Sequence, residues 1–330
     1  MTKKIVTILL TAGMLFLYSC QKNSDIFVPD TGQINAPDTS WYSTITTAMP
    51  VSALQTNLLA EPVRDSFEVS NTTTIITTSN GVQCTFPANS FVSSTGQAIT
   101  GKVYIDVLLI KKKGDMVLMN KPTTSNGNML VSGGEIFIRI KKDGKEIQLA
   151  PNAKIYLRYN DQPVNPLMKL FFGNDATPGR FNWLPNTDTL NNYIGTNIQN
   201  QVYEILTNHI HWINVDYFYD TVNSVRSTVS AQLPSNYTNA NTTAFLVFKD
   251  FRSVLGMYGD VTERRFTTGK VPNGKAAIVI AISKQGNDYF LGKETITTGI
   301  NVTAGTINQK VLLTPVKTSL ADIKAFLATL

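Results

Sequence analysis

Both histidines of the chain lie in one short segment, HIHWINVDYFYD, at residues 209–220. Residues two positions apart share a face of an extended strand, so His209 and His211 could reach the same metal ion. Zinc needs a third and usually a fourth ligand in tight geometry. Asp216 lies an odd number of positions from His211 and faces the other side of an unbroken strand. The pattern therefore favours a partly exposed histidine pair over a metal centre, and we predict no bound metal.

The remainder of the segment is predicted to be structural. Trp212, Asn214 and Asp216 share the strand face opposite His211, because each lies an odd number of positions from it. An aspartate among tryptophan and tyrosine side chains needs hydrogen-bond donors when it is buried, since an unpaired carboxylate is costly there. We therefore predict that these residues fix the entry of a strand and take no part in catalysis.

Aromatic residues are dense between positions 163 and 220. Those on strands are expected in the core. Trp183 falls in a connection rich in Pro, Asn and Gly, where an exposed ring can stack on a sugar or anchor a protein partner. We take Trp183, His209 and His211 as the candidate surface for a ligand or partner.

Familiar catalytic motifs are absent from the sequence. The chain contains no G-x-S-x-G, H-E-x-x-H, C-x-x-C, phosphate-binding loop or G-x-G-x-x-G pattern. We predict a non-enzymatic protein without catalytic residues or a cofactor. The alternative is a hydrolase acting on glycans or peptides where two domains meet, because the spacing of paired catalytic carboxylates is set in three dimensions and leaves no sequence motif.

The first twenty residues resemble the signal of a bacterial lipoprotein. Lys3 and Lys4 precede an apolar run that is shorter than a typical membrane span, and the run ends in Leu-Tyr-Ser-Cys at residues 17–20. The resemblance to the lipobox implies removal of residues 1–19 and lipidation of Cys20. Several acyl chains hold a protein stably on a membrane where one chain does not. We expect a lipid anchor at the outer membrane or cell surface, followed by a tether and N-terminal segment over 20–65.

The net charge and the cysteine content limit which binding partners and which disulfides the protein can have. Removing Lys3 and Lys4 from 29 basic residues leaves 27, against 23 acidic residues, so the mature net charge is only +4. This mild charge, without basic patches interleaved with aromatic residues, argues against nucleic acid as a partner. Cys84 has no intramolecular partner once Cys20 is lipidated, and we expect it to be a small buried apolar residue.

Alternating apolar residues predict an all-β protein of two consecutive β-sandwich domains. The strand pattern of the first domain covers 66–162, with a tight turn at Asp143-Gly144. A long connection is expected over 163–200. A second domain is expected over 201–330, closed by a short helix with Ser319 and Asp322 at its start.

Residues 81–149 resemble a ZU5-type β-sandwich, as found in lipoproteins of Gram-negative bacteria of the Bacteroidetes type. The resemblance rests on three features: an F-P-A-N-S-F segment (86–91), a G-x-x-V/I-T-G step (96–101) and a P-T…G-G-E segment (122–135). It further implies a second all-β region that opens at 212–218. ZU5-type domains are known mostly as interaction and scaffold modules, although a fold does not determine a function. Together these features predict an envelope lipoprotein that binds an envelope protein or a glycan.

Overall fold

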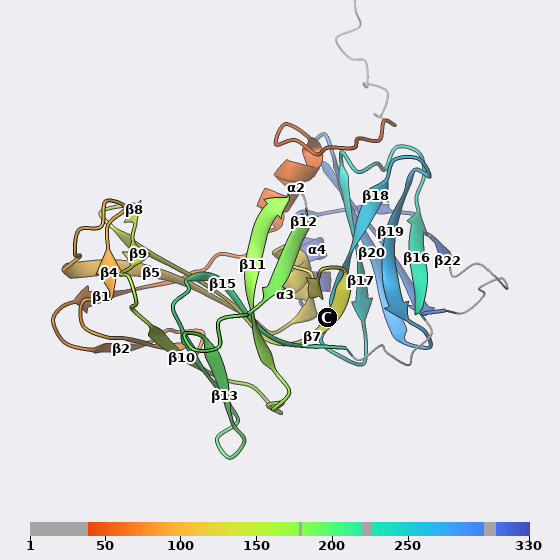
Figure 1. Ribbon diagram of the computed structural model, residues 1–330. Coiled ribbons are helices and arrows are strands. Elements are labelled where there is room, and N and C mark those ends of the chain that lie inside the picture. The colour runs from red at the N-terminus through yellow and green to blue at the C-terminus, as the bar shows by residue number, and fades with distance from the viewer. Residues whose placement is uncertain (1–38, 178–179, 220–225, 300–307) are drawn as a thin grey trace, which may run out of the picture. The chain divides into compact units, whose positions relative to one another are not determined.

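The computed structural model describes residues 39–177, 180–219, 226–299 and 308–330, and strands dominate them (Figure 1). The prediction of an all-β protein is confirmed. The main path of the first sheet runs in the order β1 (Val63–Val69), β5 (Gly101–Ile110), β7 (Asn128–Lys142), β15 (His211–Phe218), β11 (Lys169–Thr177) and β12 (Arg180–Pro185). Short strands β6 (Thr124–Ser125) and β8 (Lys145–Glu146) also pair with β7.

A second sheet covers one face of the first. Its order is β13 (Tyr193–Asn197), β14 (Val202–Thr207), β10 (Ile155–Asn160), β3 (Gln83–Phe86) and β2 (Thr74–Thr77), and β4 (Phe91–Val92) pairs separately with β9 (Gln148–Leu149). Alternate residues of the strands point between the two sheets, as period-two patterning requires. The shared core contains, among others, Val103, Ile105, Ile136, Ile138, Leu157 and Ile205. Cys84 is fully buried in this core, as expected, and its burial raises the thiol pKa to about 12.

A third sheet follows in the order β22 (Asn308–Leu312), β16 (Arg226–Gln232), β19 (Arg265–Pro272), β18 (Val254–Asp260), β17 (Thr242–Phe248), β20 (Ala276–Gln285), β21 (Asp288–Thr297) and β23 (Val316–Thr318). Its central strands are buried on both faces. Leu246 and Val279 lie in one core, whereas Phe245 and Ile280 lie in another. Such strands appear in the sequence as near-continuous apolar runs instead of alternating ones.

Helices α2 (Pro50–Leu58), α3 (Lys113–Leu118) and α4 (Leu320–Leu327) share the core on the other face of this third sheet. Leu54 of α2, Met116 of α3 and Leu327 of α4 pack there with Phe245, and Leu108 from β5 joins them. The predicted C-terminal helix is confirmed, and the Ser319 hydroxyl accepts a hydrogen bond from the Asp322 amide at 3.0 Å. No helix among the described residues has the length and apolar character needed to cross a membrane.

The predicted domain boundaries are wrong. Residues 163–200 are not a plain connection, because they supply β11, β12 and β13. Strand β15 does not open a second domain; it pairs with β7 and β11 inside the first sheet. The physical reason is burial, since Ile213 and Val215 pack in the same core as Ile136. Residues from 39 to 330 accordingly form one compact unit in which the third sheet begins at β16.

Candidate functional site

The two histidines do not converge. Strand β15 begins only at His211, so His209 precedes the strand and the assumption of a shared strand face is wrong. The His209 ring stacks on Phe172 with 3.9 Å between ring centroids, and burial lowers its pKa. The His211 Nε2 lies 2.5 Å from Oε1 of Glu146 on β8. Within the described ranges no three His, Cys, Asp or Glu side chains gather as a metal site.

Asp216 is a fully buried carboxyl, held where β7 and β15 pair irregularly. Its Oδ2 accepts a hydrogen bond from the Asn214 Nδ2 at 2.7 Å, while its Oδ1 has no hydrogen-bond partner among the described residues. Desolvation raises the pKa of Asp216 to about 7, against the opposing effect of the Ser132 and Asn214 side chains. Burial therefore disfavours the ionised form of Asp216 at the point where the two strands pair.

A second buried carboxyl lies beside this one. Glu135 on β7 pairs in register with Asn214, is fully buried, and neither of its carboxylate oxygens has a hydrogen-bond partner among the described residues. Desolvation and then the charge of Asp216 raise its pKa well above the usual range, and Lys121 opposes them. Pairs of carboxyls with raised pKa values are typical of acid–base sites. Both side chains are fully buried and neither lines the two cavities formed with Arg180, so the pair belongs to the interior of the sheet.

Trp183 does not offer its ring to a partner. It lies on β12 with no exposed surface and packs with Leu130, Phe171 and Phe181 in a small core. The expectation that it sits on an exposed loop is wrong, because the segment that carries it is a strand. Trp212 contacts the same cluster, with 6.3 Å between the two indole centroids. Cys20, the predicted lipidation site, lies outside the described residues.

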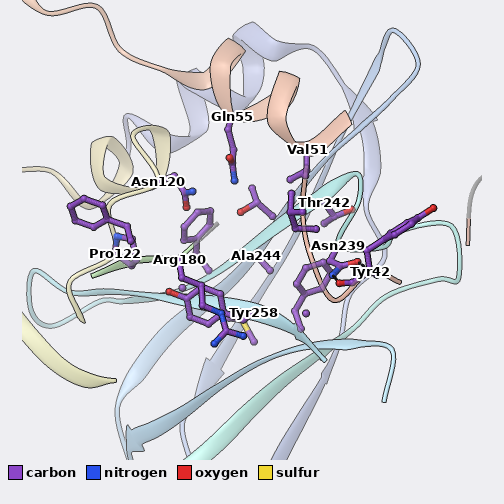
Figure 2. Close-up of a pocket in the computed structure, with 18 of the residues that line it drawn as sticks. Tyr42, Val51, Gln55, Asn120, Pro122, Arg180, Asn239, Thr242, Ala244 and Tyr258 are labelled. Atoms are coloured by element: carbon purple, nitrogen blue, oxygen red, sulfur yellow. Dashed lines mark hydrogen bonds between the residues drawn. The ribbon is translucent and has the colours of Figure 1, made fainter. Parts of the chain in front are cut away.

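The accessible site is a pair of adjoining cavities of about 330 and 450 Å³. Both are lined by Arg180, Phe181, Gly256 and Tyr258, so β12 of the first sheet and β18 of the third form their common wall. Figure 2 shows the smaller cavity, with Gln55 pointing down from α2 toward the space above Arg180 and Tyr258. The lining thus combines parts of the chain that are far apart in sequence.

The N-terminal segment closes one side of the smaller cavity. Tyr42 lines this cavity. The side-chain amide of Asn239 forms two hydrogen bonds with the Tyr42 backbone: it accepts from the N–H at 3.0 Å and donates to the carbonyl at 2.6 Å. Trp41 packs its ring on Phe266 with 5.1 Å between centroids. Gly259 permits this arrangement, because an added Cβ would lie only 2.8 Å from the Asn239 Cβ. The wall is therefore held by specific contacts.

Arg180 is the charged group common to both cavities. Its guanidinium carbon lies 4.9 Å from the centroid of the Tyr258 ring, a cation–π contact. No carboxylate of the described residues forms an ion pair with Arg180. Lys270 brings a second cation to the larger cavity and donates to the Asn128 side-chain oxygen at 3.0 Å. The remaining polar lining consists of amide and hydroxyl groups, including Gln55, Asn120, Thr242 and Thr268.

The lining of the two cavities is aromatic, amide, hydroxyl and cationic in character. Among the described residues that line the cavities, none carries a carboxylate, an imidazole or a thiol. Aromatic rings and planar amide groups can stack on a ligand and donate and accept hydrogen bonds, as polar small-molecule sites require. Sequence reasoning missed these residues, because no motif joins them. A scan against protein-family models finds no match to the chain, and a search of curated proteins finds no similar sequence, so the chemistry of the site rests on the residues described above.

Proposed function

We propose that the chain is a lipid-anchored envelope protein whose folded part binds a glycan without hydrolysing it. One observation carries the proposal: a pair of adjoining cavities lined by aromatic, amide, hydroxyl and guanidinium groups, with no acid–base pair among the described lining residues. Glycoside hydrolysis needs two carboxyl groups on either side of the scissile bond. The ZU5-like resemblance of residues 81–149 fits a role in interaction, and the lipobox-like residues 17–20 fit an outer-membrane or cell-surface location.

Binding can be measured with the detergent-solubilised full-length protein on a panel of immobilised neutral and acidic oligosaccharides. We expect saturable binding to at least one of them, with no shortening of the bound oligosaccharide on prolonged incubation. Release of shorter products by the purified protein would overturn the non-enzymatic part of the proposal and favour a hydrolase. Failure to bind any saccharide, with capture of an envelope protein instead, would overturn the glycan part.

A lipid anchor requires that Cys20 carry the acyl chains. Cells that express the parent protein should incorporate labelled palmitate into it, and the protein should partition into the detergent phase, because several acyl chains dominate membrane affinity. Cys20→Ala should abolish the incorporation. Cys84→Ala is the matched control, since Cys84 is the only other cysteine and is buried in the core; it should remain labelled. Equal labelling of the Cys20→Ala protein would contradict the lipid anchor.

A further inference from the structure

We infer that the glycan bound in these cavities carries a carboxylate, and that Arg180 is the residue that selects it. This inference rests on the proposed function and names its ligand class: an acidic saccharide containing a uronic acid. The starting observation is the position of Arg180, which contributes to the lining of both cavities where they share a wall. A group bound by Arg180 is therefore accessible from either cavity.

The state of the Arg180 guanidinium supports an anionic ligand. The cation–π contact with the Tyr258 ring at 4.9 Å holds the Arg180 guanidinium at the shared wall and does not use its N–H donors in an ion pair. A planar guanidinium presents paired donors that match the two oxygens of a carboxylate. Among the described residues, five arginines form ion pairs with carboxylates, for example Arg252 with Asp161 and Arg139 with Asp106, whereas Arg180, Arg226 and Arg264 form none. Arg180 has none among the described residues, so its donors remain available.

The charged residues near the wall shared by the two cavities also favour an anionic ligand. Lys270 lines the larger cavity, and Lys121 lies just behind the wall with its Nζ 3.7 Å from the centroid of the Phe181 ring. Asp175 is the nearby acid, and it is already engaged by Lys121 at 3.2 Å. With no acidic residue among the described lining residues, the local potential is positive and favours an anion.

The rest of the lining identifies a saccharide in preference to a simple anion. Gln55 and Asn120 enter the smaller cavity from α2 and from the turn after α3, and Figure 2 places both above Arg180. Their amides can donate to and accept from vicinal ring hydroxyls. A uronic acid combines these hydroxyls with one carboxylate on a single ring, which fits the single guanidinium among amides and hydroxyls of the smaller cavity.

The test compares two probes with the same sugar backbone, a short oligogalacturonate and its uncharged, fully methyl-esterified form, titrated into the detergent-solubilised full-length protein. The free acid should bind at least about tenfold more tightly than the ester, which corresponds to the loss of a charge-assisted bidentate contact. Its affinity should fall with added salt, whereas the affinity of the ester should not. Arg180→Gln should weaken the acid about tenfold or more and leave the ester unchanged, and Arg180→Lys should restore only part of the affinity.

Arg226→Gln serves as the matched control, because Arg226 on β16 lines neither cavity; it should bind both probes as the parent does. Equal affinity for the acid and the ester, unaffected by Arg180→Gln, would overturn the inference and leave glycan binding intact. Failure of every oligosaccharide to bind the parent would overturn the proposed function itself. Tighter binding of a sulfated saccharide than of the uronate would also overturn the carboxylate assignment.

Discussion

Replacing Gly114 with alanine is expected to lower the free energy of unfolding by about 4 kcal/mol and to release α4. A Cβ added at Gly114 in α3 would lie 1.8 Å from the Leu327 carbonyl oxygen and 2.5 Å from its carbonyl carbon. Both atoms belong to the backbone, so rotation of a side chain cannot relieve the clash. Helix α4 must move away, and Ile323 and Leu327, which are fully buried, then lose their contacts.

Chemical denaturation measures the loss of stability, and hydrogen exchange locates it. The amides of α4 should lose protection, while those of β5 and β7 in the first sheet should keep theirs. Gly195→Ala is the matched control: the nearest atom to an added Cβ there is 3.8 Å away, so its effect should stay within about 0.5 kcal/mol. A Gly114→Ala protein with parental stability and a protected α4 would contradict the close packing of α3 and α4.

The sequence was informative where local chemistry decides the structure. Alternation in 103–109 and 136–140 located β5 and β7, and the turn between β7 and β8 has Asp143 and Gly144 at positive φ, as that residue pair favours. Ser319 located the start of α4 because capping depends on a single side chain. The residues of β18 do not show a clear strand pattern, since Gly256 and Gly259 interrupt its alternation.

Long-range pairing escaped prediction, and with it the site. The register of β15 against β7 depends on which core Ile213 and Val215 pack in. The spacing of apolar residues within one segment does not indicate which sheet that segment joins. The same limit hid the cavities. Tyr42, Gln55, Arg180 and Tyr258 come from four separate segments, and only the folded chain brings them together. Trp183 was misplaced for a related reason: a strand rich in Asn, Pro and Gly neighbours resembles a loop in sequence.

The buried carboxyl of Asp216 should make the protein lose stability as the pH rises. Its folded pKa of about 7 lies above the ordinary value of 3.8, so the folded state binds more protons than the unfolded state between these limits. The contribution is fully present below about pH 4 and is lost as the pH rises through about 7. At about 1.4 kcal/mol for each pH unit, the loss is on the order of 4 kcal/mol. Glu135 acts in the same direction, because its pKa is also raised.

Asp216→Asn removes the ionisation and keeps an oxygen that can accept from Asn214. Relative to the parent, this variant should gain on the order of 4 kcal/mol between about pH 4 and pH 8, measured by urea denaturation across that range. Glu135→Gln should show a gain of the same sign.

Asp106→Asn is the control of opposite sign. Arg64 and Arg139 hold the pKa of Asp106 below its usual range, so its contribution is present above about pH 4 and is lost as the pH falls through the folded pKa. Above about pH 4 this variant should be less stable than the parent by a nearly constant amount, and the difference should shrink in acid. A stability difference between Asp216→Asn and the parent that stays constant from about pH 4 to pH 8 would contradict a neutral, buried Asp216. If the difference grows with pH as expected, the burial of Asp216 lowers the free energy of unfolding of the parent protein at alkaline pH.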